Sequence, residues 1–281
     1  MKFKAVMFDF DGTITNKGVA VPSEKMAKTI IEAAKKVPVA FCTGRQLNSF
    51  KKHGITEFLK YLKKDEVIPF FKNLFLIAEN GAMGYCYDFQ KHKFKAFYRA
   101  EWPEKFIPRR SFKTRWHKEI KNFAEFLSHK IIIVTSIKNH HDLPIDKVYA
   151  ASDKLYKMCH EFLSKISKNY EKYLHIGNSG LGILVSPAKA DKDFGIRKFA
   201  QFLAHKRKLK FSPKISEILV IGDSAIYGGN DYYFLRGEYG TPYTVGSYDK
   251  SKKLPKPVFH NGKKLLHEKG TIYLLEKYIT T

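Results

Sequence analysis

Short apolar runs alternate with amphipathic stretches in the first eighty residues of the chain. Residues 3–8, 37–42 and 74–78 form apolar runs that are short enough to be buried strands. Between them, one helix is expected to open at Pro22-Ser23, with its apolar residues on one face, and a mostly polar helix at about residues 46–63. Such alternation of strands and helices is typical of a parallel sheet covered by helices.

The middle of the chain has a different pattern, and the first pattern returns after Pro187. In the middle we expect a hairpin (83–87 with 93–99), helices at about 116–129 and 146–167, and strands at about 131–137, 170–176 and 180–185. A helix at about 193–208 and a strand at 218–221 follow. The sequence therefore predicts an α/β fold: a core of residues 1–82 and 187–281 with an α+β unit, residues 83–186, inserted into it.

Composition narrows the class of protein. The 281 residues are 44% hydrophobic and 28% charged, as in a globular protein with one or two cores. No apolar run approaches the ~20 residues of a membrane span, and acidic residues interrupt the apolar N-terminal stretch, so neither a span nor a signal peptide is expected. Cys42, Cys86 and Cys159 are too scattered for a disulfide framework or a zinc site, which favours a reducing, cytoplasmic location.

The net charge of +24 suggests an anionic partner, such as a phosphorylated metabolite, nucleic acid or an acidic membrane surface. Residues 91–121 concentrate this charge, with eleven Lys and Arg against three Asp and Glu, and aromatic residues lie between them. Arg109 and Arg110 could bind a second anionic group of a substrate, and Trp102 or Trp116 could stack on it. Alternatively, the aromatic residues form a core and the lysines solvate its outer face.

Polar residues that could take part in catalysis occur in four separate segments, and all of these except the lysine follow predicted strands. They are Asp9-Phe10-Asp11-Gly12-Thr13, Thr43-Gly44-Arg45, Lys192 after the insert, and Gly222-Asp223 followed by Gly228-Gly229-Asn230-Asp231. The carboxyl ends of parallel strands meet at one edge of a sheet. Carboxylates gathered there can hold Mg²⁺, and one of them can attack phosphorus. Taken alone, each segment has an ordinary explanation as a turn, a strand end or a surface lysine, but their combination favours phosphoryl transfer.

The order of these motifs resembles the haloacid-dehalogenase-like (HAD) superfamily of phosphohydrolases from end to end. The superfamily implies a Rossmann-like parallel sheet core. The insert between the second and third motifs looks like the superfamily's type II cap. Its mixed α+β pattern and Glu79-Asn80-Gly81 resemble the Cof-like type IIB branch, to which sugar phosphatases and phosphomannomutases belong.

The resemblance implies a role for each motif. Asp9 would attack phosphorus and carry an aspartyl-phosphate, Asp11 would act as acid and base, and Thr43 and Lys192 would complete the catalytic set. The implied Mg²⁺ ligands are Asp9, Asp11 through its backbone carbonyl, Asp223 and Asp231. The implied substrate-binding residues are Gly12, Thr43, Gly44, Arg45, Lys192 and Asn230, with Arg109 and Arg110 as candidates in the cap.

One departure from the family pattern leaves alternatives open. Residues 224–229 separate Gly222-Asp223 from Asn230-Asp231, and this longer loop is similar to that of phosphomannomutases. The second motif instead resembles the phosphatase form, and no arginine lies between Asp11 and Arg45, where the mutases carry one. We expect a Mg²⁺-dependent phosphatase acting on a sugar phosphate or another small anionic metabolite. The alternatives are a phosphosugar mutase and a protein that binds nucleic acid or anionic surfaces, including a nucleic-acid end phosphatase.

Overall fold

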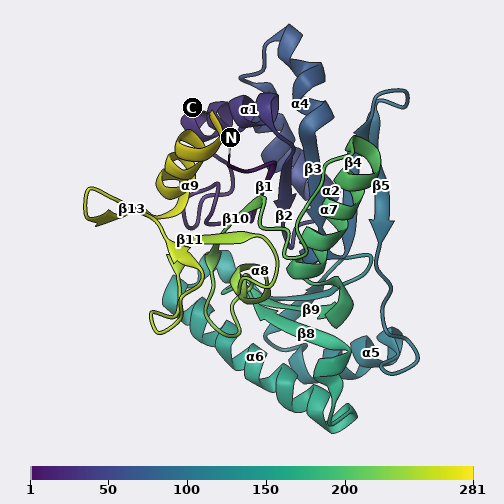
Figure 1. Ribbon diagram of the computed structural model, residues 1–281. Coiled ribbons are helices and arrows are strands. Elements are labelled where there is room, and N and C mark those ends of the chain that lie inside the picture. Colours follow the sequence, from purple (N-terminus) through teal and green to yellow (C-terminus); the bar gives the residue numbers. More distant parts are fainter. Residues whose placement is uncertain (1, 281) are drawn as a thin grey trace.

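The computed structural model describes residues 2–280, and within them a large sheet of eight strands forms the centre of the molecule (Figure 1). The six strands from β12 to β3 pair in parallel, whereas β4 and β5 are antiparallel to their neighbours. The order across the sheet is β12 (Lys256–Pro257), β11 (Thr241–Ser247), β10 (Ile218–Ser224), β1 (Ala5–Phe8), β2 (Val39–Cys42), β3 (Leu74–Ala78), β4 (Met83–Asp88) and β5 (Lys93–Arg99).

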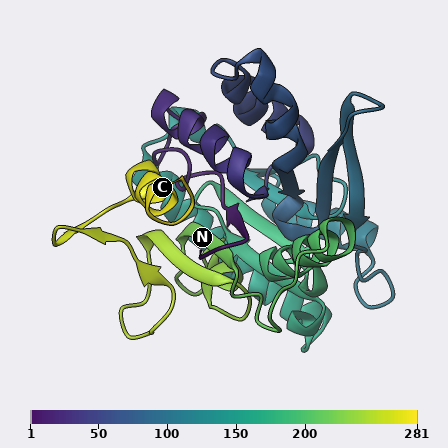
Figure 2. The same ribbon diagram turned by 45° about the horizontal axis from the view of Figure 1, so that its top comes forward.

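Helices cover both faces of this sheet (Figure 2). Val6 and Phe8 of β1 pack in one cluster with α1 (Glu24–Lys36) and α9 (His267–Leu275). Ala5 and Met7 pack in another with α7 (Lys192–Arg207) and α8 (Tyr232–Leu235). Because both faces are buried, successive residues of the central parallel strands β1, β2 and β3 are all apolar, which is the pattern seen in the sequence.

The helices of the first eighty residues agree in part with the sequence pattern. Helix α1 begins where expected, since the Ser23 side chain accepts a hydrogen bond from the Met26 N–H at 3.2 Å. The predicted polar helix is present as α2 (Leu47–Phe50) and α3 (Thr56–Leu59), joined by a wider helical turn at Lys51–Ile55. Helix α4 (Val67–Asn73) was not predicted. Neither were β11, β12, α8, α9 and the protruding hairpin of β13 (Phe259–His260) and β14 (Lys263–Lys264).

The hairpin of β4 and β5 belongs to the large sheet and not to the inserted unit to which the sequence pattern assigned it. Strand β4 pairs with β3, with Phe75 opposite Cys86, and β5 continues from β4. The connection between β3 and β4 is a short turn at Glu79–Gly81. A connection this short can join only antiparallel neighbours, so β4 runs back alongside β3. The hairpin of β4 and β5 therefore extends the edge of the core sheet.

A second, antiparallel sheet lies within residues 100–187, which we call the cap. Its order is β6 (Ala124–Leu127), β7 (Ile133–Ile137), β9 (Gly182–Pro187) and β8 (Leu174–Asn178). Helices α5 (Arg109–Ile120) and α6 (Ile145–Ile166) pack on it around a core of its own that includes Phe112, Trp116 and Leu155. Figure 1 shows the cap beyond one end of the core sheet.

The predicted helix at about residues 116–129 is confirmed only as far as Ile120 and is wrong beyond it. Helix α5 ends at Ile120, and residues 124–127 form β6, which pairs with β7. The buried side chains Phe112, Trp116 and Ile120 recur at every fourth position and define the helix face. Trp116 is fully buried, with its Nε1–H donating to Thr135, so it belongs to the cap core and does not offer a stacking surface. Trp102 is buried in the same core.

Among residues 2–280, no helix combines the length and the apolar character that crossing a membrane requires.

Candidate active site

Strand β1 delivers Asp9 to the edge of the sheet that faces the cap. The Asp9 N–H donates to the Ile221 carbonyl at 2.9 Å, so Asp9 continues alongside β10. Its side chain is buried, and Oδ1 lies 2.7 Å from Nζ of Lys192. The first and third motifs of the sequence therefore meet in a buried ion pair.

Lys192 is the first residue of α7 and lies between two carboxylates. The helix begins here because Asp191 accepts a hydrogen bond from the Phe194 N–H at 3.1 Å. The Lys192 ammonium is 2.7 Å from Asp9 and 2.5 Å from Oδ1 of Asp231. Burial alone would lower the pKa of Lys192, but the charges of Asp231 and Asp9 outweigh it and raise that pKa. The lysine is therefore a fixed positive charge beside Asp9.

Asp9, Asp223 and Asp231 form a cluster of carboxylates. One oxygen from each lies within 4.8 Å of the others. Burial, with the negative charge of Asp231 as the next cause, raises the pKa of Asp9 to about 7 and that of Asp223 to about 9. Three carboxylates share the single charge of Lys192, so the ionised cluster keeps a net negative charge, and its hard oxygen ligands fit Mg²⁺.

The second carboxylate oxygen of Asp231 binds the end of β10. It accepts hydrogen bonds from the backbone N–H groups of Asp223 (2.9 Å) and Ser224 (3.2 Å). Gly12 approaches the end of the same strand closely, since a Cβ on Gly12 would lie 2.5 Å from Oδ2 of Asp223. Gly12 also has a φ of +71°, so both space and backbone conformation require glycine here.

Asp11 lies outside the carboxylate cluster and pairs with Arg45. Nε of Arg45 is 2.9 Å from Oδ2 of Asp11, and Nη2 is 2.5 Å from Oδ1. The Arg45 guanidinium also lies 4.6 Å from the centre of the Phe10 ring. The Asp11 side chain is 55% exposed, so it is accessible to a ligand, and its expected metal contact through the backbone carbonyl stays a prediction.

Thr43 and Gly44 lie directly under the cap. Thr43 is buried, and its hydroxyl oxygen accepts a hydrogen bond from the Arg45 N–H at 3.1 Å. A Cβ on Gly44 would lie only 2.6 Å from a methyl group of Leu184 in β9. The cap therefore contacts the second motif at its glycine, and a larger residue there would have to displace the Leu184 side chain.

Glu79 anchors the cap beside this motif. Its buried carboxylate accepts three successive backbone N–H groups of the cap, from Lys130 (3.1 Å), Ile131 (2.7 Å) and Ile132 (3.3 Å). Nε2 of the neighbouring His129 is 3.2 Å from the Gly44 carbonyl, and burial lowers the pKa of His129. Glu79-Asn80-Gly81, singled out by the sequence pattern, thus includes a docking point for the cap.

Arg109 and Arg110 are not brought to the carboxylate cluster. Nη2 of Arg109 donates to the carbonyls of His129 and Ile132, both at 3.0 Å, and so supports the cap loop that Glu79 binds. This corrects the expectation that the Arg109 guanidinium is free to bind a substrate anion. Arg110 is exposed on α5.

The predicted residue Asn230 also lies at the site. Its Oδ1 atom is buried without a hydrogen-bond partner among residues 2–280.

Three residues near the site were not predicted from the sequence: Asp191, His267 and Thr271. Asp191 could have been found from its place before a helix, where aspartate is a common cap. His267 and Thr271 contact the carbonyls of Gly12 and Thr13 from α9, at 2.6 and 2.8 Å. No pattern in the neighbouring sequence indicates these two contacts, because the paired residues lie 255 and 258 positions apart.

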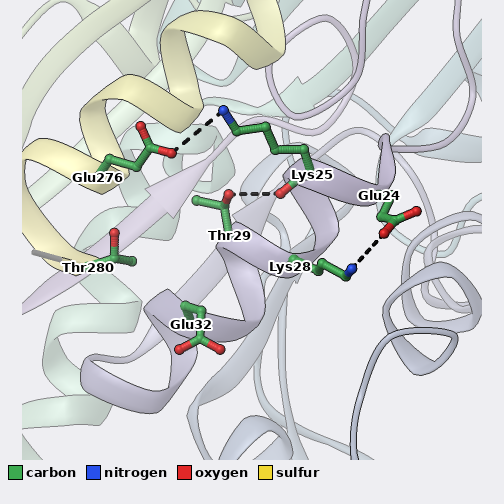
Figure 3. A pocket seen from close by; sticks show the side chains of 7 residues that line it. All are labelled: Glu24, Lys25, Lys28, Thr29, Glu32, Glu276 and Thr280. Carbon is green, nitrogen blue, oxygen red and sulfur yellow. Dashed lines mark hydrogen bonds and ion pairs between the residues drawn. The ribbon is translucent and has the colours of Figure 1, made fainter.

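A cavity of about 530 Å³ lies elsewhere, between α1 and the C-terminal segment (Figure 3). Four of its charged side chains pair with one another, Lys28 with Glu24 at 2.6 Å and Lys25 with Glu276 at 3.8 Å, and Glu32 pairs with Lys35. Figure 1 shows α1 and the C-terminus at the end of the core away from the cap. The chemistry therefore places the candidate active site at the carboxylate cluster and not in this cavity.

Comparison with known proteins agrees with this geometry. A model of the haloacid dehalogenase-like hydrolase family matches residues 6–235, which include all four motifs. The chain belongs to this family. The resemblance seen in the motifs, the α/β fold and the expected enzyme class, a hydrolase, are thereby confirmed, whereas the type IIB cap branch stays a prediction. None of the curated proteins matches the chain by sequence.

Solved structures of this hydrolase family share the fold at low sequence identity. An N-terminally truncated IMP-nucleotidase of Plasmodium falciparum is 16% identical, with a TM-score of 0.63, over 99% of this chain and 71% of that one. The C-terminal domain of a C. albicans trehalose-6-phosphate phosphatase is 15% identical, with a TM-score of 0.62, over 98% of this chain and 92% of that one. A Thermotoga maritima protein is 19% identical, with a TM-score of 0.56, over 99% of this chain and 98% of that one.

Proposed function

We propose that this hydrolase is a Mg²⁺-dependent phosphatase that cleaves the phosphate monoester of a small anionic metabolite, such as a sugar phosphate. The observation that carries the proposal is Asp9, a buried carboxylate at the end of β1 that is held by Lys192 within a cluster of three carboxylates. The similarity in fold to an IMP-nucleotidase and a trehalose-6-phosphate phosphatase supports the reaction class, although it does not identify the substrate.

In this proposal the reaction has two displacements at phosphorus. An Asp9 oxygen attacks phosphorus while the bond to the leaving oxygen breaks, and Asp11 donates the proton that this oxygen needs. A water molecule then attacks the aspartyl-phosphate, gives its proton to Asp11 and releases phosphate, which restores Asp9. The ion pair with Arg45 keeps the Asp11 carboxylate oriented at the rim of the site.

The remaining residues bind and orient the phosphate. The Thr43 hydroxyl and the Gly44 N–H would bind its oxygens, and the fixed charge of Lys192 would balance the charge that develops on them. Asp9, the Asp11 carbonyl and Asp223 would hold Mg²⁺, with Asp231 and Asn230 completing or orienting its surroundings. When bound, the ion would neutralise phosphate charge and hold phosphate and nucleophile together.

A cytoplasmic location stays part of the proposal. Its support is that the three cysteines of the chain are free, as is usual in a reducing compartment.

The first test is Mg²⁺-dependent phosphate release from a panel of sugar phosphates, bisphosphates, nucleotides and phosphorylated oligonucleotide ends. We expect release by the wild-type protein and a loss of at least about a thousandfold in Asp9→Asn, which keeps the size of the side chain but not the nucleophile. Release that persists in Asp9→Asn would contradict the mechanism. Phosphate transfer between positions of a sugar, without release, would identify a mutase.

A further inference from the structure

Strand β8 of the cap contacts both core segments that hold the charged centre of the site. One segment is the start of α7, which carries Lys192, and the other is the loop before α8, which carries Asp231. Lys192 and Asp231 form the 2.5 Å ion pair beside Asp9. A single cap strand thus reaches both partners of this ion pair through their neighbours in the chain.

The contact to α7 is made by His175. Its Nδ1–H donates to Oδ2 of Asp191 at 2.8 Å, while Oδ1 of Asp191 caps the helix at Phe194. The imidazole also stacks on Tyr233 of α8, with ring centres 4.0 Å apart and planes 1° from parallel. Both His175 and Asp191 are largely buried. His175 therefore orients the residue that precedes Lys192.

The contact to the loop is made by the backbone of β8. The Asn178 N–H donates to the Gly228 carbonyl at 2.9 Å, and Asn178 pairs with Gly229 in a parallel bridge. Because β8 is the edge strand of the cap sheet, this core loop extends the cap sheet by one short segment. The contact involves residues 224–229, the extra length that distinguishes this chain from most Cof-like phosphatases.

The Asn178 side chain makes the end of β8 rigid. Its Oδ1 accepts hydrogen bonds from the Ser152 hydroxyl (2.7 Å) and the Gly180 N–H (2.8 Å), and Nδ2 donates to Asp153 (2.7 Å). The loop is equally confined, since a Cβ on Gly229 would lie 2.6 Å from the Ser224 hydroxyl. Strand β8 and the loop before Asp231 are therefore tightly packed where they meet.

We propose that β8 is a positioning strand: His175 and the Asn178 backbone set the relative placement of Lys192 and Asp231, so that the ion pair with Asp9 is complete only when the cap is docked. The catalytic consequence rests on the proposed phosphatase function, but the structural coupling does not. A buried lysine shared by two carboxylates tolerates little displacement, because each lost contact leaves a buried charge without a partner. Cap docking thereby assembles the site as well as covering it.

Three substitutions of His175 separate this role from simple packing. His175→Phe keeps a ring against Tyr233 but loses the donor to Asp191, whereas His175→Asn keeps a donor near the position of Nδ1. His175→Gln places its amide near Nε2 instead. It serves as a second variant without the Nδ1 donor if the phenylalanine protein does not fold.

We expect His175→Phe and His175→Gln to lower kcat roughly tenfold on every substrate, including a small generic ester, with little change in KM, because the charged centre is misplaced. His175→Asn should stay close to wild type. In metal-free protein, hydrogen exchange of amides in residues 191–196 and 224–231 should be faster in the two defective variants. Wild-type kcat and exchange in a folded His175→Phe or His175→Gln protein would overturn the proposal, and so would a change confined to KM.

The two proposals fail in different ways. If the wild-type protein releases no phosphate from any substrate, the phosphatase assignment fails, while hydrogen exchange still decides whether β8 controls both segments. If the wild-type protein is active, Asp9→Asn is inactive and His175→Phe matches the wild type in kcat and exchange, only the positioning role is overturned.

Discussion

At the scale of single residues, the charge balance of the site depends on Lys192. Replacing it with methionine leaves Asp9 and Asp231 buried without their shared cation. Breaking a buried ion pair in this way should lower the free energy of unfolding by about 3–5 kcal/mol. Urea unfolding of Lys192→Met measures the loss. The control is Lys189→Met at an exposed lysine nearby, and equal stability of the two variants would contradict the arrangement.

The raised pKa values of Asp9, about 7, and Asp223, about 9, make the metal-free protein sensitive to pH. Between the ordinary carboxyl pKa of 3.8 and these values, the folded protein holds protons that the unfolded chain has released. Stability should therefore fall as pH rises from about 4 to about 9, with both groups contributing up to about 7 and Asp223 alone above it. We expect the Tm measured in EDTA to decrease over this range, and to decrease less in Asp223→Asn.

Added Mg²⁺ should raise the Tm more at the upper end of this pH range than at the lower end. The reason is that Asp9 and Asp223 must lose their protons to bind the ion. Thermal unfolding with and without Mg²⁺ at the two ends of the range measures the difference. A pH-independent Tm in EDTA, together with no effect of Mg²⁺, would contradict a metal site at these carboxylates.

At the scale of elements, Glu79 links the end of β3 to the cap. In Glu79→Gln, an amide N–H₂ group replaces one of the two carboxylate oxygens. This group cannot accept the hydrogen bonds that the backbone N–H groups of the cap donate there. Leaving buried donors without an acceptor should cost about 1–3 kcal/mol. We expect faster hydrogen exchange or proteolysis at residues 129–132 and a higher KM, since the cap docks less well. Glu101→Gln, at an exposed glutamate, is the control and should behave as wild type.

Arg109 and Arg110 are adjacent in α5 but differ in what they contact. Arg109→Ala removes the donor to two backbone carbonyls and should destabilise the protein by about 1–3 kcal/mol, whereas Arg110→Ala should be nearly neutral. Unfolding measurements on the two single variants test this. If Arg109→Ala raises KM without any loss of stability, the guanidinium binds substrate directly, as the sequence first suggested.

At the scale of the whole molecule, the net charge of +24 should draw anionic substrates toward the site. Salt screens such attraction, so kcat/KM should fall by roughly threefold or more between low and physiological ionic strength. The fall should be steeper for a bisphosphate than for a monophosphate. Equal salt dependence for both would show that the charge does not steer substrates. Tight, salt-sensitive binding of nucleic acid or anionic vesicles without turnover would instead favour the binding-protein alternative.

Prediction from sequence succeeded where the determining interactions are close along the chain. The apolar runs before Asp9, Thr43 and Asp223 become β1, β2 and β10, since the two covered faces of a parallel sheet demand apolar residues at successive positions. Prediction failed where a distant partner decides the outcome. Residues 124–127 form a strand because β7 lies beside them, and the hairpin of β4 and β5 joins the core because β3 offers a free edge.

The sequence by itself determined strands β1, β2, β3 and β10 of the core sheet, the motif residues at the carboxyl ends of β1, β2 and β10, and the hydrolase family, because apolar runs and motif residues can be read from the chain without its spatial contacts. Only the tertiary structure decided which side chains meet: Lys192 with Asp231, Arg109 with the cap loop, and His175 with Asp191. The reason is physical. Burial and charge pairing depend on what surrounds a group in space, and partners such as Lys192 and Asp231, or Lys192 and Asp9, lie 39 and 183 residues apart along the chain.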